Sequence, residues 1–598
     1  MAGVMQGGGA FPDFDMLRIV ARGQLKLLLE SMPELKDLII EQPLMKPLDR
    51  IAGAQFLKSH GVDKIYKLEP STTKALSGCR QRMYLIRPSM KSVKCVADTI
   101  NADIAIQQKR KYKIIFVPKK CHVCERILEQ EGVFGHVSLD EFHLDLIPLD
   151  RDLLSLEMPG FFKSFFLEND QSWLHTVAKS LVSLQDLYGI IPNVYGVGRG
   201  SKISFDLMNM MLRYGCDQKR RVSNEIGHVF LIDRDIDFVT PLLSQVTYEG
   251  LVDETFGIKS GFVEFGPEIT RAKTVRLLLT SDDEVFEEIR NRHFSNVFGY
   301  LGAKARELQS GYDKRHGISS VSDMKNFVSN ELKGLKQQHK SLALHIGASE
   351  VILGKKNKGD FEELLTTEHN LLEGIESRGI TNYIEECIHR QLDKSLILRH
   401  LCLFSQTNDG LPPALYKSMR TQFLHSHGFE HLLTFHNLKK IGLLTEQEKA
   451  PTPAAKQLGI RKSSFQALRK KLNLVPKFNE DFNLKNPSHM AYVFSGAYTP
   501  LSCKLIEQVI SREGFTGLED VMKHVPEPVF SEYKVKSARA TTSSKVILVY
   551  FVGGCTYSEV VALRFLGKLK GWRFIIATSE MLNGRSLMDQ VVDTAAER

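Results

Sequence analysis

Three aspartates and an arginine directly follow an apolar run near the middle of the chain. Apolar residues 229–232 favour a strand that is buried on both faces. The charged residues after it are Asp233, Arg234, Asp235 and Asp237. Burying an unpaired carboxylate costs several kcal/mol even after relaxation. We therefore expect this acidic motif to be structural, with Arg234 between carboxylates and loop amides donating to the remaining oxygens.

The same residues allow a chemical alternative. Residues 235–239 fit the pattern D-x-D-x-[TV], in which the first aspartate is the nucleophile of a phosphatase and the second is a general acid. Asp235 and Asp237 would take these roles. The nucleophile should directly follow the strand, however, and Asp235 comes two residues late. An aspartate-nucleophile phosphatase using Asp235 therefore stays a remote alternative, because a short motif outside its usual context matches by chance.

A helix is expected to begin just after the acidic motif. Thr240 is a good N-cap residue, and Pro241 suits the first helical position. The residues expected to pack this helix are Leu242, Leu243, Val246 and Leu251.

Five blocks of sequence, in a fixed order, resemble the SM (Sec/Munc) family, the cytosolic chaperones of SNARE assembly. The blocks are LIDRDIDFVTPLLSQVTYEGLVDE at 231–254, VFEEIRNRHF at 285–294, LRHLCLFSQTNDGL at 398–411, HMAYVFSGAYTPLSCKLIE at 489–507 and VILVYFVGGCTYSEVVALRFL at 546–566. The stretches YLIRP, FVPKK and FSGAYTPLS are most similar to the vacuolar and endosomal sorting branch. GFVEFGPE, HFSNVFG and ELKGLKQQH resemble the animal B-type paralogue of the class C vacuolar protein sorting branch.

Alternating apolar runs and helical stretches predict parallel-sheet α/β domains at both ends of the chain, with a mainly helical insertion between them. The resemblance implies an arch of three domains. The expected divisions are domain 1 at 1–145, the first part of domain 2 at 146–255, domain 3 at 256–484 with a projecting hairpin at about 318–375, and the second part of domain 2 at 485–598. The fold class is therefore α/β plus α, with a discontinuous second domain.

The resemblance implies that SNARE helices are the partners. A syntaxin-like Qa-SNARE would bind between domains 1 and 3, and a further SNARE, such as an R-SNARE, would bind along the hairpin. The hypothetical SNARE-binding residues, which stand amid several lysines, are Met324, Phe327, Val328, Leu332 and Leu335. An apolar stripe beside basic residues suits an amphipathic helix with an acidic flank, but the same residues could simply pack the hairpin.

The hairpin sequence departs from the family, which commonly has a proline where this chain reads Asn330-Glu331-Leu332-Lys333-Gly334. Because proline breaks helices, its absence can change how the hairpin extends. This difference favours an alternative function, a scaffold adaptor without direct SNARE templating.

A second candidate surface lies at residues 428–435. In the vacuolar sorting branch the matching region docks onto a helical scaffold subunit, and the B-type paralogue has a VIPAR-like partner. Phe429 and Leu432 are three residues apart and could share an exposed face. Leu433 and Phe435 are expected to enter the core.

Composition agrees with a large soluble cytosolic protein, and the absence of a coherent set of active-site motifs favours a binding protein over an enzyme. The chain has 598 residues and a formal charge of +9, from 79 basic and 70 acidic residues, which is too mild to indicate nucleic-acid binding. Its nine scattered cysteines are expected to be reduced, and Cys121 and Cys124 lack a second pair for zinc. No cofactor, metal or catalytic residue is expected. The resemblance implies a cytoplasmic protein, held peripherally by its partners on late endosomes, lysosomes and recycling or sorting endosomes.

Overall fold

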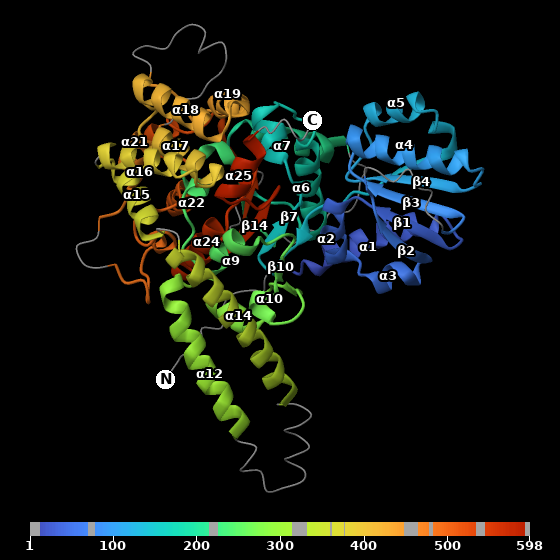
Figure 1. Ribbon diagram of the computed structural model, residues 1–598, viewed down its shortest axis with the longest axis horizontal. Helices are drawn as coiled ribbons and strands as arrows, with labels where there is room; N and C mark the ends of the chain where they lie inside the picture. Colours follow the sequence, from blue (N-terminus) through green and yellow to red (C-terminus); the bar gives the residue numbers. More distant parts are fainter. Residues whose placement is uncertain are drawn as a thin grey trace. The chain divides into compact units, whose positions relative to one another are not determined.

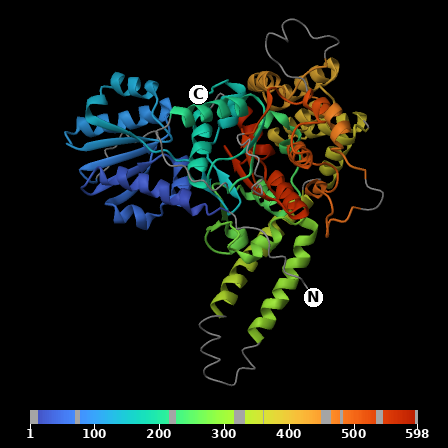
Figure 2. The same cartoon turned by 180° about the vertical axis from the view of Figure 1, so that it is seen from behind.

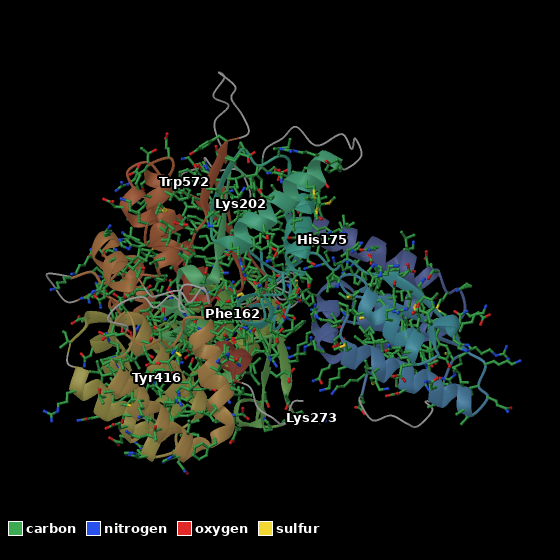
Figure 3. All side chains as sticks on the ribbon, turned by 90° about the horizontal axis from the view of Figure 1, so that it is seen from above. Phe162, His175, Lys202, Lys273, Tyr416 and Trp572 are labelled. Atoms are coloured by element: carbon green, nitrogen blue, oxygen red, sulfur yellow. The ribbon has the colours of Figure 1, made fainter. Side chains whose placement is uncertain are left out.

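The computed structural model describes residues 12–69, 78–214, 225–313, 332–358, 361–375, 377–447, 464–477, 482–533 and 544–592. The chain divides into two compact units. The first contains residues 1–159, 175–189 and 208–222, and the second contains residues 160–174, 190–207 and 223–598. Figures 1 and 2 show the ribbon from two sides, and Figure 3 shows the described side chains.

The first unit is built on a five-stranded parallel sheet with the strand order β2-β1-β3-β4-β5. Its strands are β1 (Lys36–Ile40), β2 (Val62–Lys67), β3 (Gln81–Ile86), β4 (Lys111–Phe116) and β5 (Val137–Glu141). The helices between and before them are α1 (Asp15–Glu30), α2 (Gln42–Ile51), α3 (Ala54–Ser59), α4 (Met90–Ala105) and α5 (His122–Gln130). The predicted alternation of strands and helices is confirmed here. The short strands β6 (Ile147–Pro148) and β7 (Leu153–Ser155) pair antiparallel.

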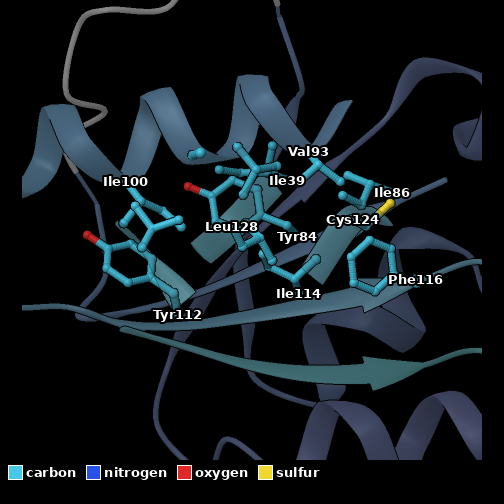
Figure 4. Packing of buried hydrophobic residues seen from close by; sticks show 13 residues of the cluster. Ile39, Tyr84, Ile86, Val93, Ile100, Tyr112, Ile114, Phe116, Cys124 and Leu128 are labelled. Atoms are coloured by element: carbon cyan, nitrogen blue, oxygen red, sulfur yellow. The ribbon is translucent and has the colours of Figure 1, made fainter. Parts of the chain in front are cut away.

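One face of this sheet carries a closely packed apolar core (Figure 4). Tyr84 and Ile114 come from the central strands, and Ile100 comes from α4. Cys124, on α5, is buried in the same cluster. Cys124 is therefore a packing residue, whereas Cys121 is exposed at the start of the helix.

The second unit contains four parallel strands and one antiparallel edge strand in the order β12-β8-β9-β13-β14. They are β8 (Asn193–Val197), β9 (His228–Asp233), β12 (Val529–Tyr533), β13 (Val546–Val552) and β14 (Arg573–Thr578). The late strand β13 pairs with β9, more than 300 residues earlier in the chain. The sheet is therefore discontinuous in sequence, and its strand β13 is buried along its whole length.

Helices dominate the segment between β9 and β12. A short antiparallel pair, β10 (Phe262–Phe265) and β11 (Val275–Leu278), precedes most of them. The helices are α8 (Val239–Leu242), α9 (Tyr248–Phe256), α10 (Pro267–Thr270), α11 (Glu284–Ile289), α12 (Val297–Asp313), α14 (Leu332–Lys358), α15 (Phe361–Glu373), α16 (Ser377–His389), α17 (Lys394–Thr407), α18 (Pro413–His427), α19 (Leu432–Lys440), α21 (Phe465–Leu472), α22 (Leu501–Ser511) and α23 (Glu519–Met522). Elsewhere lie α6 (Leu174–Tyr188), α7 (Arg199–Tyr214), α24 (Tyr557–Lys570) and α25 (Gly584–Val591).

Two of these helices, α12 and α14, run side by side and project from the rest of the second unit (Figures 1 and 2). They are the arms of a hairpin, and the first arm lies before the expected range of 318–375. The second arm lies inside that range, but α15, also inside it, packs against α16 and α17 instead. The expected domain boundaries at 145, 255 and 484 describe a finer division than the two units and stay a prediction. Among the described residues, no helix combines the length and apolar character needed to cross a membrane.

Candidate functional site

The acidic motif begins with a carboxylate that is buried at the end of β9. The oxygens of Asp233 accept hydrogen bonds from the backbone N–H groups of Gly200 and Ser201, at 2.6 and 2.7 Å, and from the Ser201 hydroxyl at 2.6 Å. Burial and the neighbouring Asp235 raise the pKa of Asp233 to about 7, and these donors act in the opposite direction. Because backbone N–H groups at a helix start attract negative charge, Asp233 joins β9 to the first turn of α7.

The glycines before α7 are needed for this approach. A Cβ at Gly198, which has a φ of +106°, would stand 2.4 Å from the Asp233 carboxyl carbon. The loop resembles a phosphate-binding loop in its glycine spacing, but its helix N-terminus already holds a carboxylate of the protein. The glycines therefore serve an internal contact.

Arg234 forms the second contact of the motif, with a residue 325 positions later. Its two terminal nitrogens donate to Glu559 at 2.7 and 3.0 Å, and both side chains are fully buried. Arg234 was expected to lie between carboxylates; its carboxylate partner in the structure is Glu559, and its second terminal nitrogen also donates to the Asp237 carbonyl. Glu559 also closes a capping box with Thr556 at the start of α24. The ion pair thus fastens β9 to the helix that follows β13.

Asp237 completes the motif. Its carboxylate accepts hydrogen bonds from Thr240 N–H at 2.9 Å, the Thr240 hydroxyl at 2.5 Å and Leu501 N–H at 3.0 Å. The Tyr498 hydroxyl donates to it at 3.3 Å. The prediction that Thr240 is an N-cap is wrong, because α8 begins at Val239 and Thr240 itself donates to Asp237. The helix also ends at Leu242, although the expected packing residues are all buried.

These contacts bear on the phosphatase alternative. A general acid must hold a proton that it can give to substrate, yet Asp237 is buried and receives four donors. The cavity beside Asp235 has a volume of about 40 Å³, room for a few water molecules. The arrangement suits a structural junction better than a phosphate-ester site.

We expect the purified chain with Mg²⁺ to show no hydrolysis of a phosphatase substrate above a blank, and Asp235→Asn to leave that result unchanged. A chromogenic phosphate ester provides the assay. Magnesium-dependent turnover that disappears in Asp235→Asn would contradict the structural interpretation.

An exposed apolar patch lies where α18 turns into α19. Phe429 is 61% exposed, and Leu432 and Leu433 are each 46% exposed. The prediction that Phe429 and Leu432 share an exposed face is consistent with these values, but the prediction that Leu433 enters the core is wrong. A short 3-10 turn, η7 (Phe429–His431), precedes α19, so both leucines lie in the exposed part of its first turn. We refer to Phe429, Leu432 and Leu433 as the 429–433 patch.

The 429–433 patch rests on buried aromatic residues. Phe435 is 3% exposed, as expected, and its ring packs edge-on against Phe423 at 5.5 Å and against Tyr416 at 6.5 Å. Tyr416 is labelled in Figure 3. This packing gives the patch a firm base, so the exposed side chains are held in place without being part of the core.

The hairpin residues proposed for SNARE binding are only partly described. Met324, Phe327 and Val328 lie outside the described residues, as do Asn330 and Glu331. Leu332 is the first residue of α14, and Leu335 is half-buried one turn later. The structure therefore places two of the five residues on the second arm of the hairpin.

Comparison of the amino-acid sequence with known protein families identifies the family of this chain. A sequence model of the Sec1 family matches residues 36–590. The chain belongs to the Sec1 family. This Sec1-family protein is 50% identical to Vacuolar protein sorting-associated protein 33B of Rattus norvegicus, over 97% of each chain. It is 34% identical to Vacuolar protein sorting-associated protein 33A of the same species, over 97% of this chain and 98% of the other. The resemblance to the B-type paralogue of the vacuolar sorting branch is confirmed.

Solved structures confirm the fold of this Sec1-family protein. The Unc18–syntaxin 1 complex from Monosiga brevicollis matches with a TM-score of 0.58 and 16% identity, over 96% of this chain and 99% of the other. The SM protein Vps45 in complex with the Qa SNARE Tlg2 matches with a TM-score of 0.58 and 15% identity, over 96% and 97% of the chains. The SM fold class predicted from the sequence is thereby shown.

Several residues that contact the acidic motif were not predicted from the sequence. They are Ser201, Tyr498, Leu501 and Glu559. A local signal existed for Glu559, because a helix beginning near Thr556 with an acid in its first turn could be predicted. Its pairing with Arg234 had no local signal.

Proposed function

We propose that this Sec1-family protein is a non-enzymatic SNARE-binding chaperone and tethering subunit for vesicle docking and fusion. Its proposed setting is late endosome to lysosome transport and related sorting traffic, together with a helical, VIPAR-like scaffold subunit. Peripheral attachment to these membranes would come through its partners. The observation that carries the proposal is the projecting α12/α14 hairpin on a Sec1-family fold.

Relatives and structural neighbours support this proposal. The relatives at 50% and 34% identity are both named for vacuolar protein sorting. The neighbour Vps45 is bound to a Qa SNARE, and the neighbour Unc18 is bound to syntaxin 1. A Qa-SNARE is therefore the first partner to test, and an R-SNARE is the second.

The charges on α14 agree with a SNARE-type helix as ligand. Lys336 and Lys340 are both exposed and lie one turn apart, beside the half-buried Leu335. Leu342, further along, is 3% exposed and packs into the unit. The outer part of this arm thus places the half-buried Leu335 beside positive charge, which suits an amphipathic helix that has acidic residues along its edge.

We expect calorimetric titration to show saturable binding to a Qa- or R-SNARE peptide from an endosomal panel. The chain should be titrated alone and with its scaffold partner. Lys336→Glu/Lys340→Glu should weaken binding at least about tenfold, because two attractive charges become repulsive. Lys417→Glu/Lys568→Glu, which reverses two exposed lysines on other helices, is the matched control and should bind like the unmodified chain.

The second candidate function is a scaffold adaptor that does not bind SNAREs directly. The exposed 429–433 patch favours it, because this apolar surface would serve a scaffold partner whether or not the hairpin binds a SNARE. If the scaffold complex forms but SNARE peptides bind neither the chain alone nor that complex, the chaperone proposal is rejected in favour of the adaptor.

A further inference from the structure

Three potential metal ligands gather at one edge of the sheet in the first unit. Asp37 is the second residue of β1, Asp63 is the second residue of β2, and Cys79 stands two residues before β3. Strands β2, β1 and β3 are adjacent and parallel, so all three begin at the same edge. Residues that are remote in sequence are thereby brought together.

An irregularity between β1 and β2 contributes to this gathering. Lys36 is paired with Val62, but Asp37 is paired with Lys64, so Asp63 is an extra residue on its strand. A bulge of this kind re-aims a side chain that regular pairing would direct elsewhere. Ligand atoms of Asp37, Asp63 and Cys79 all lie within 4.8 Å of one another.

The hydrogen bonding of Asp37 is incomplete. Its side chain is fully buried, and Oδ2 accepts a hydrogen bond from the Cys79 N–H at 2.8 Å. Its Oδ1 is buried and has no hydrogen-bond partner among the described residues. The nearest lysine in sequence, Lys36, donates instead to the His60 carbonyl at 2.9 Å. A buried carboxylate oxygen without a donor or a cation is costly, so this group indicates a missing ligand.

We propose that Asp37, Asp63 and Cys79 bind a divalent transition-metal ion, with Zn²⁺ as the preferred ion. Zinc accepts carboxylate oxygen and thiolate sulfur together in tetrahedral sites. Binding releases the Cys79 thiol proton to solvent and replaces its contact with Asp63 Oδ2, which lies 3.9 Å from the sulfur. Asp63 is exposed, so water can reach the fourth position.

The present spacing is close to what zinc requires. Bonds of about 2.0 Å to oxygen and 2.3 Å to sulfur place tetrahedral ligands about 3.3–3.5 Å apart. The 3.9 Å separation between Cys79 Sγ and Asp63 Oδ2 therefore needs only a small side-chain adjustment. The ion would cross-link the starts of three strands and supply the charge that Asp37 Oδ1 lacks.

The full-length chain, reduced and freed of metal, should be titrated with Co²⁺ alone and then with Zn²⁺. We expect one equivalent of Co²⁺ to produce a thiolate-to-cobalt charge-transfer band that Zn²⁺ removes. Saturating Zn²⁺ should also raise the Tm by a few degrees, because it binds only the folded form of this site.

Cys79→Ser should abolish the charge-transfer band, and Asp63→Asn should weaken metal binding at least about tenfold. Cys121→Ser is the matched control, since it removes a different solvent-accessible cysteine of the first unit, and it should bind like the unmodified chain. Absence of saturable binding in the unmodified chain would overturn the proposal. Binding of undiminished affinity in either Cys79→Ser or Asp63→Asn would overturn it as well.

Discussion

Glu559→Ala is expected to lower the free energy of unfolding of the second unit by about 3–5 kcal/mol. The substitution removes the carboxylate that accepts hydrogen bonds from both terminal nitrogens of Arg234. Both side chains are fully buried, so water cannot replace the lost partner. The guanidinium would be left as a buried charge without its counter-ion. Denaturant titration followed by tryptophan fluorescence measures this, because Trp173 and Trp572 both lie in the second unit.

Two further variants separate the charge from the packing. Glu559→Gln should lose less stability than Glu559→Ala, since its amide oxygen can still accept one hydrogen bond from Arg234. Lys523→Ala breaks an ion pair whose side chains are 70% and 77% exposed, and no measurable change is expected. A loss in Glu559→Ala no larger than that in Lys523→Ala would show that the buried pair does not hold the sheet to α24.

The same pair predicts a dependence on pH. Burial disfavours the charge on Glu559, but Arg234 and the Ser502 hydroxyl outweigh it and hold the pKa of Glu559 below its ordinary value. The unfolded chain therefore binds more protons as the pH falls, so the contribution of Glu559 is present at pH 7 and is lost as the pH falls through the folded pKa. The stability difference between the unmodified chain and Glu559→Ala should shrink below about pH 4.

Phe429→Asp is expected to abolish binding of the proposed helical scaffold partner, with at least about a hundredfold loss of affinity, and to leave the fold intact. A carboxylate in an apolar interface loses its hydration without gaining a partner. The folded chain tolerates the change because Phe429 is 61% exposed and the base of the patch is formed by other side chains. Co-purification and calorimetry with the scaffold partner measure the binding, and thermal unfolding measures the fold.

Leu569→Asp is the matched control for the patch. Leu569 is 56% exposed on α24, far from residues 429–433 in sequence, and its substitution should leave scaffold binding unchanged. Leu433→Asp should weaken binding as Leu432→Asp does, because both leucines are 46% exposed. A Tm drop of many degrees in Phe429→Asp would contradict the docking assignment, as would unchanged affinity for the scaffold subunit.

Local patterns were enough to predict parallel sheets at both ends of the chain, although strands β5, β8 and β12 were not predicted. The run at 546–552 is apolar throughout, and in the structure it is a strand buried along its length. The run around Ile114 likewise lies within a central strand of the first unit. Such predictions succeed because burial on both faces of a parallel strand requires apolar side chains at every position. Family membership was equally readable, since five ordered blocks can be recognised without coordinates.

Side-chain direction was harder to predict where an element begins. Leu433 and Phe435 are two residues apart, yet Leu433 is exposed and Phe435 is buried. Both residues lie in α19, where positions two apart differ by about 200° around the helix axis and so face nearly opposite sides. The prediction that both enter the core therefore conflicted with helical periodicity, and which of the two faces is buried was decided by the tertiary packing of α19.

By itself, the sequence determined the Sec1 family, the parallel sheets and the presence of a charged motif that had to find partners. Tertiary structure alone decided which partners these were. Arg234 forms an ion pair with Glu559, which lies 325 positions later in the chain. Asp37 lies close to Asp63 and Cys79 because three parallel strands begin at one edge of the sheet and one of them carries an extra residue. The physical reason is that hydrophobic patterning is a local property of the chain, whereas the partner of a buried charge is set by which strands and helices become neighbours after folding.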